Sequence, residues 1–101
     1  MRRKHEVVAG ARVSVWDNGD RWADRYTVVY LDEVDERGRV PYLAMSAAPF
    51  SPQGVGMHGE MPIHLVQYEG RGGVFRKRIR FADLPTDCQK VVIQDLEGAN
   101  G

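Results

Sequence analysis

Three arginines alternate along one short segment and offer the clearest chemistry in the chain. Arg76, Arg78 and Arg80 share one face of an expected strand, and Arg71 lies a few residues earlier. Side chains on one face of a strand repeat every ~6.6 Å, and guanidinium groups can bind successive phosphates bidentately. Charges in such a row also protect a solvated edge strand from aggregation. The row therefore predicts either a phosphate-binding site or a solvated edge.

The charge balance favours the solvated edge. The 101 residues carry 14 Lys and Arg against 14 Asp and Glu, so the formal net charge is zero. A chain without net positive charge is not drawn as a whole to nucleic acid, which we keep as an alternative partner. An acidic protein is an equally good candidate partner for the basic strand. Another copy of the chain also fits, with its acidic Asp32–Glu36 segment against the basic strand, so a homodimer is one expected arrangement.

Cys88 is the single cysteine, and it follows the expected start of a helix. A helix N-terminus can lower a thiol's pKa and activate it as a nucleophile. A nucleophile also needs a base, for which His58 and His64 are the candidates. Cys88 falls on the apolar stripe of its helix, however, and free cysteines are usually buried. We expect core packing rather than a small Cys/His enzyme, and we assign no catalytic residue.

His58, Glu60 and His64 share strand parity and together offer three metal-ligating side chains. A glycine and a proline interrupt this segment, and neither a paired-histidine helix motif nor a CxxC motif is present. The Gly54-x-Gly56 pattern makes no phosphate loop, because no Lys-Ser or Lys-Thr pair follows it. We predict no metal site and no cofactor.

The segment Ala47–Met61 is expected to form a long loop, since it holds two prolines and three glycines in fifteen residues. Compact domains seldom carry loops of ~12 to 15 residues without a binding role or disorder. Its Pro-Gln-Gly turn and its histidine are the candidate contacts: Pro52, Gln53, Gly54 and His58.

These side chains depend on a series of short strands. The strand candidates are Arg12–Trp16, Tyr26–Leu31, Val40–Ser46, Ile63–Tyr68 and Arg76–Phe81. The second candidate is β-branched and aromatic throughout, which is typical of a central strand covered on both faces. Pro41 restricts pairing at the beginning of the third. In the last, Ile79 and Phe81 face inward and the arginines outward.

One helix follows the strands. Pro85 suits the first helical position, with the preceding Leu84 extended or acting as the cap. An apolar stripe predicts that the helix packs on a sheet, and its members are Leu84, Cys88, Val91, Val92 and Leu96. Gly98 is expected to end the helix.

These elements predict an α+β domain of four to five mostly antiparallel strands, in a curled sheet or small open barrel of SH3-like proportions, with one C-terminal helix. We expect a flexible N-terminal arm at residues 1–10, a single domain at 11–98 and a flexible tail at 99–101. No apolar run is long enough to span a membrane, and the N-terminus lacks the apolar core of a secretory signal. With one cysteine, we expect a cytoplasmic protein.

Three blocks of sequence stand out together. They are Asp24–Val29, then Met45-Ser46 with Pro49 and Pro52–Gly54, then Arg78–Phe81 with Asp83–Pro85 and Asp87–Gln89. The combination resembles a family of small uncharacterised bacterial proteins associated with phages, plasmids and other integrated elements. The resemblance implies no activity, cofactor or catalytic residue. We expect a small non-enzymatic binding or accessory domain, with an unknown protein as its partner and no membrane contact. Its expected contact surfaces are the Ser46–Glu60 loop and the arginine strand.

Overall fold

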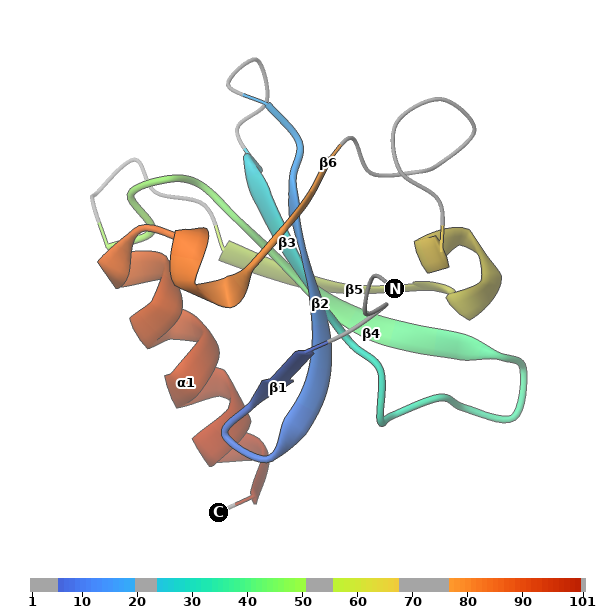
Figure 1. The fold of residues 1–101 in the computed structure, drawn as a ribbon. Coiled ribbons are helices and arrows are strands. Elements are labelled where there is room, and N and C mark those ends of the chain that lie inside the picture. The colour runs from blue at the N-terminus through green and yellow to red at the C-terminus, as the bar shows by residue number, and fades with distance from the viewer. Residues whose placement is uncertain (1–5, 20–23, 51–55, 68–76, 101) are drawn as a thin grey trace.

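A computed structural model describes residues 6–19, 24–50, 56–67 and 77–100 of the chain. Within these residues, six strands form one antiparallel sheet, which is open rather than closed, and one α-helix follows at the C-terminus (Figure 1). The predicted α+β class is therefore confirmed. The strands are β1 (Glu6–Val8), β2 (Ala11–Asp17), β3 (Tyr26–Tyr30), β4 (Arg39–Met45), β5 (Gly56–Pro62) and β6 (Lys77–Ile79). The helices are α1 (Thr86–Asn100) and two short 3-10 helices, η1 (Ile63–Gln67) and η2 (Phe81–Asp83).

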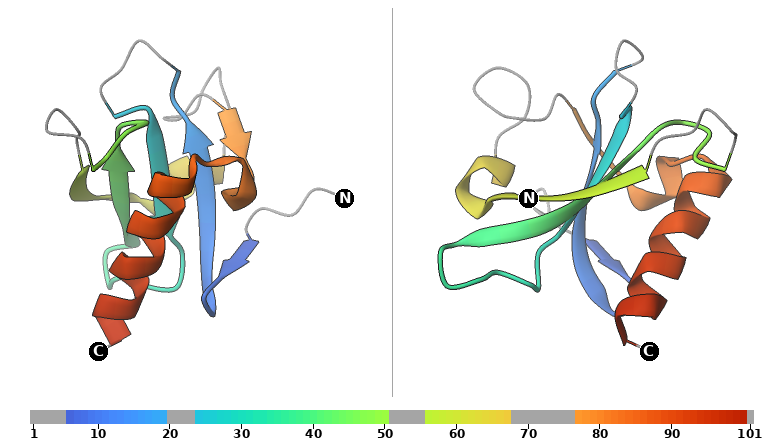
Figure 2. Two further views of the ribbon diagram at one scale, coloured as in Figure 1. Left: turned by 90° about the vertical axis from the view of Figure 1, so that its left-hand side faces the viewer. Right: turned by 180° about the vertical axis from the view of Figure 1, so that it is seen from behind.

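The strands lie in the order β1-β2-β3-β4-β5, and β6 also pairs with β2. Because β3 occupies one side of β2, β1 and β6 share the other side end to end. β1 pairs with the first half of β2, and β6 pairs with residues 15–17. β5 is thus the terminal strand on the opposite edge of the sheet (Figure 2).

Both faces of the sheet are covered by apolar side chains. In β2, Val13 and Val15 face α1, whereas Trp16 faces the other way. The core under α1 consists of Val8, Val13, Val15, Tyr26, Val28, Tyr30, Leu43, Met45, Leu84, Cys88, Val92 and Leu96. The core on the other face consists of Trp16, Val29, Val40, Met61 and Val66. The predicted central strand is correct, since every residue of β3 is buried.

The helix also agrees with the prediction. It begins at Thr86, directly after Pro85, and Leu84 before it is extended. Four residues of the predicted stripe are buried in the core, and Val91 packs against that core. The predicted end is wrong, because the helix continues through Gly98 to Asn100. A Cβ at Gly98 would meet no atom within 4 Å, so no packing constraint requires glycine there.

Two predictions between β4 and β6 are wrong. The second half of the expected Ala47–Met61 loop is β5, and the expected strand Ile63–Tyr68 is η1 over its first five residues. Both prolines that argued for a loop, Pro49 and Pro52, precede β5 in the sequence. The glycines within β5 are tolerated because it is an edge strand. Ile63 and Val66 are three residues apart, so one turn of η1 brings both onto the second core.

The N-terminal segment is more ordered than its sequence indicates. Residues Glu6–Val8 pair with β2, although we expected residues 1–10 to form an arm. A side-chain contact adds to this pairing, since Oε1 of Glu6 accepts a hydrogen bond from the backbone N–H of Phe81. The turn into β2 uses positive φ angles at Ala9 and Gly10. Alanine rarely adopts such an angle, so this tight turn was not predictable from the sequence.

Candidate functional site

The described arginines of the basic strand are held by neighbouring side chains. The guanidinium of Arg78 lies 6.0 Å from the centroid of the Trp16 ring, across the β2–β6 pair. Arg80 lies 3.4 Å from the carboxylate of Asp83, and its backbone N–H also donates to that carboxylate. Arg71 and Arg76 lie outside the described residues. Each of the two described arginines thus has a neighbouring side chain, and the side chain of Arg80 is still 79% exposed.

The predicted loop site is only partly described. Pro52, Gln53 and Gly54 lie outside the described residues, whereas His58 lies in β5. His58 pairs with Leu43 and shares its face of the sheet, toward α1. Its Nε2 lies 2.8 Å from Oδ1 of Asp95 in α1.

Tyr30 completes a small polar group beside this contact. Its hydroxyl is the buried side-chain atom without a hydrogen-bond partner in the described part of the chain. Burial raises the pKa of Tyr30 far above its ordinary value, and the neighbouring Asp95 adds to the rise. The hydroxyl therefore stays protonated. The contact between Asp95 and the His58 ring therefore joins β5 and α1, with the Tyr30 hydroxyl beside it.

Cys88 is not activated by its position near the start of α1. Burial raises the pKa of its thiol to about 11, and the charge of Asp87 adds to this rise. Its Sγ lies 3.3 Å from the carbonyl oxygen of Ser46, to which it donates a hydrogen bond. The thiol thus belongs to the core, as the apolar stripe predicted.

The three candidate metal ligands are not brought together. Glu60 lies 3.7 Å from Nε of Arg39, while His58 contacts Asp95 and His64 lies in η1. Within residues 6–19, 24–50, 56–67 and 77–100, no group of three His, Cys, Asp or Glu side chains could hold a metal ion.

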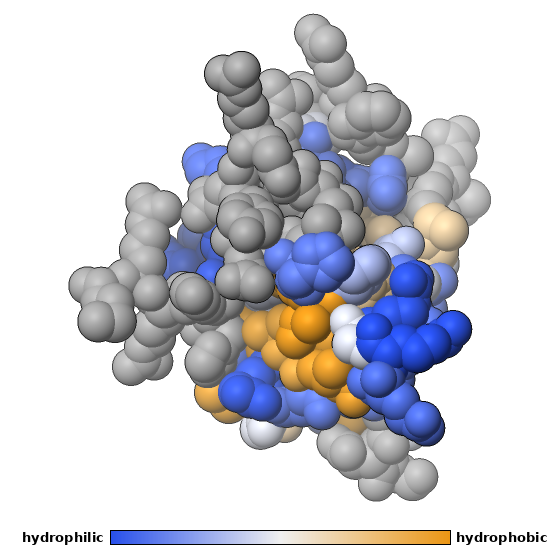
Figure 3. All heavy atoms as spheres, turned by 90° about the vertical axis from the view of Figure 1, so that its right-hand side faces the viewer, coloured by the Kyte–Doolittle hydropathy of each residue, from blue (hydrophilic) through white to orange (hydrophobic). Residues whose placement is uncertain are grey.

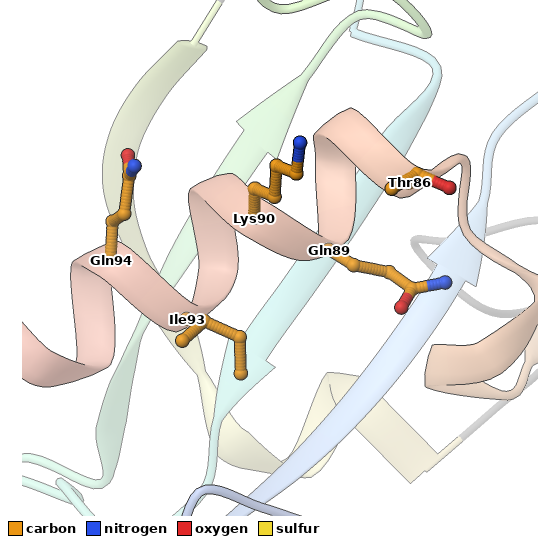
Figure 4. Close-up of a pocket in the computed structure, with 5 residues that line it drawn as sticks. All are labelled: Thr86, Gln89, Lys90, Ile93 and Gln94. Carbon is orange, nitrogen blue, oxygen red and sulfur yellow. The ribbon is translucent and has the colours of Figure 1, made fainter.

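Two further surfaces were not indicated by the sequence. A shallow groove lies along the outer side of α1, and Figure 4 shows its lining side chains, Thr86, Gln89, Lys90, Ile93 and Gln94. On the side of the molecule away from α1, apolar side chains gather next to hydrophilic ones (Figure 3). The partly buried members of that face are Leu31, Tyr42 and Ile63.

The outer edge of β5 is the most distinctive surface. The N–H of Ile63 donates to the carbonyl of Gly38, 2.8 Å away, which identifies this as a hydrogen-bonded pair of the ladder. Such pairs alternate along antiparallel strands, so the backbone groups of Met57, Gly59 and Met61 point toward β4. Those of Gly56, His58 and Glu60 point outward. No backbone group of the described residues pairs with them.

One outward group on this edge is already bound. Nη2 of Arg39 donates to the carbonyl oxygen of Glu60 at 3.0 Å, and Nε of the same side chain lies near the Glu60 carboxylate. Pro62, farther along, lacks an N–H on the outward side. Arg39 and Pro62 therefore limit pairing at the C-terminal end of β5, whereas no described residue pairs with the outward backbone of Gly56 and His58.

The side chains beside this open stretch differ on the two faces. Met57 is 53% exposed on the face away from α1. Next to it, Gly59 has no side chain, and the Tyr42 ring lies over its backbone. The sequence carried a signal for this strand, because Met57 and Met61 alternate with the polar His58 and Glu60.

Comparisons with known proteins do not identify the chain. No protein family matches it. Neither a curated protein nor a solved structure matches it either. In the part of the chain that the structure describes, no helix has the length and apolar character needed to cross a membrane.

Proposed function

We propose that this protein is a small non-enzymatic binding domain that accepts an extended segment of a protein partner as an additional strand beside β5. The observation that carries the proposal is the outer backbone of Gly56 and His58, which has no backbone partner among the residues that the structure describes. Strand addition to an open sheet edge is a common mode of peptide recognition, in which backbone hydrogen bonds supply affinity and alternate side chains supply specificity.

The edge lacks most of the devices that usually protect a sheet. Natural edge strands are shortened, bulged or provided with lysine and proline. β5 is seven residues long and pairs with β4 without interruption, and its one formally charged side chain is bound to Arg39. Such an edge supports a binding role.

The chemistry beside the edge indicates what segment would fit. An added strand would place one face of its side chains against the exposed Met57 and the Tyr42 ring that lies over Gly59. The other face would meet His58 and Glu60. We therefore expect a segment that alternates apolar with polar or basic residues.

The alternatives are less well supported. In the basic strand, the contacts of Arg78 with the Trp16 ring and of Arg80 with Asp83 would compete with binding of nucleic acid. A thiol enzyme would require an ionised Cys88, whose pKa is raised by burial. The proposal includes a cytoplasmic location, because a single buried thiol suits a reducing compartment. It also includes an accessory role in a mobile element, which rests on the resemblance described above.

Two matched variants at Gly56 test the proposal. Its N–H points outward, and a Cβ there would meet no atom within 4 Å. Gly56→Pro removes the outward N–H without removing a bond to β4, whereas Gly56→Ala retains it. We would select decapeptides from a displayed library and measure their affinities by fluorescence anisotropy. Because Gly56→Pro loses one backbone hydrogen bond, it should bind the peptides about 3- to 10-fold more weakly than the parent chain. Gly56→Ala should bind them like the parent. Equal affinity for both variants would contradict strand addition.

A further inference from the structure

Resting on this proposed function, we infer that the strand beside β5 is β5 of a second copy of this chain, paired antiparallel about a two-fold axis at His58. In this register, each outward residue of one copy meets an outward residue of the other. Gly56 lies opposite Glu60 of the second copy, and the two His58 residues lie opposite each other. The partner is thus a second copy rather than an unrelated peptide.

Backbone chemistry favours this register. Hydrogen-bonded pairs form only between residues whose N–H and C=O groups point at each other. Pairing about His58 uses the outward groups of Gly56, His58 and Glu60 on both copies. The Glu60 carbonyl, which accepts from Arg39, has a second lone pair for the N–H of the opposite Gly56.

Side-chain size favours it as well. On the face away from α1, the exposed Met57 of one copy lies opposite Gly59 of the other. Gly59 contributes no side chain, and the hydroxyl end of the Tyr42 ring lies over it, so the methionine would pack against this ring. Each copy therefore covers the exposed methionine of the other.

Charge is compatible with the pairing. The Glu60 carboxylates stand opposite glycines, so they do not face each other. A register centred on Glu60 would place two carboxylates side by side, which destabilises a strand pair. At His58, each ring contacts Asp95 of its own copy, so the rings are held on the α1 side of the sheet.

The dimer should be weak. Pairing of one short strand buries less surface than the ~1,200 Å² at the low end of stable interfaces. Sedimentation velocity over a wide concentration range should therefore show a reversible monomer–dimer equilibrium. The second copy would then compete with any added peptide.

The Gly56 variants test whether the dimer forms through the outer edge of β5. Gly56→Pro removes one N–H from each copy, and two lost hydrogen bonds should raise the dimer Kd roughly 10- to 100-fold relative to Gly56→Ala. A parent chain that stays monomeric at every concentration would overturn the dimer. The peptide affinities would still decide the proposed function separately.

Cross-linking tests the register itself and does not depend on a proline variant. Residues opposite each other in a hydrogen-bonded pair have Cα atoms about 5.5 Å apart, within disulfide range. Two copies of His58→Cys should therefore form a disulfide-linked dimer on mild oxidation. Glu60→Cys is the matched control, because its two thiols would be separated by roughly 13 Å along the strands. Equal cross-linking by both variants, or none by His58→Cys, would overturn the register.

Discussion

Nε2 of His58 lies 2.8 Å from Oδ1 of Asp95, and this contact joins the edge strand β5 to the helix α1 across 37 positions of sequence. It holds the imidazole on the side of the sheet that α1 covers. The backbone N–H and C=O of His58 point away from β4, where an added strand would pair with them. The histidine thus matters to the candidate site through its backbone and its position, not as a catalytic base.

Loss of the Asp95 carboxylate should have a small effect on stability and little on peptide binding. The His58 side chain is 62% exposed, and even a fully charged pair at an exposed position contributes only about 0.2 to 1 kcal/mol. Urea denaturation of Asp95→Asn should show a decrease in that range, while Glu97→Gln on the same helix serves as the control. A large decrease in peptide affinity would show that the side-chain contact, rather than the backbone, forms the site.

Gly59→Ala should be less stable than Gly56→Ala. A Cβ at Gly59 would overlap the far end of the Tyr42 ring, whereas Gly56 faces open space. Because the ring is partly exposed and can turn away, we expect a cost of about 1 kcal/mol in the free energy of unfolding. A double variant that also carries Tyr42→Ala should remove the clash. Equal stability of the two alanine variants would show that Tyr42 does not lie over Gly59.

The Cys88 thiol should react slowly in the native protein. Burial raises its pKa to about 11, so very little thiolate is present at pH 8. Iodoacetamide labelling followed by mass spectrometry should show slow modification in buffer and rapid modification in urea. Rapid labelling of the folded protein would support the Cys/His enzyme instead.

Arg76, Arg78 and Arg80 should contribute little to binding of nucleic acid. The Arg78 guanidinium lies 6.0 Å from the centroid of the Trp16 ring, and the Arg80 guanidinium lies 3.4 Å from the Asp83 carboxylate. Affinities of the parent and of the triple arginine-to-alanine variant for DNA and RNA should be weak and alike. A parent that binds, with a salt slope that falls by about one unit for each arginine removed, would favour the nucleic-acid alternative.

Asp17 should stabilise the fold above pH 4 and not in strong acid. Its burial tends to raise the pKa, but hydrogen bonds from Arg25 and from the N–H of Gly19 outweigh this, and the pKa lies below its usual 3.8. A carboxyl with a lowered folded pKa contributes stability above its unfolded pKa and loses it as pH falls through the folded value. Denaturation of Asp17→Asn should therefore show a deficit at pH 7 that disappears near pH 2. A deficit independent of pH would indicate that packing, not charge, is involved.

The sequence predicted the elements whose pattern is periodic. Alternation places Val13 and Val15 under the helix, and the stripe from Leu84 to Leu96 marks the face of α1 that packs on the sheet. The local sequence pattern predicts less well those strands whose formation depends on pairing with a partner strand. β1 and β5 lie at the edges of the sheet and have weak sequence patterns, so their pairing with β2 and β4 decides them.

The candidate site was only partly predictable. His58 was selected as a loop residue, but its strand and its contact with Asp95 depend on chain folding. The arginines were selected because their charge is visible in the sequence. Their contacts are not: Arg78 lies near Trp16 in β2, and Arg80 lies near Asp83 in η2. An open sheet edge has no residue signature of its own, since its reactive groups are backbone.

Amide hydrogen exchange measured by NMR tests the open edge of β5 most directly. In dilute protein, the outward amides of Gly56, His58 and Glu60 should exchange quickly, and the amides of Met57, Gly59 and Met61, which bond to β4, should exchange slowly. At high concentration, or with a selected peptide, the outward amides should become protected while the inward ones change little. Outward amides that exchange equally fast under all three conditions would contradict strand addition at β5.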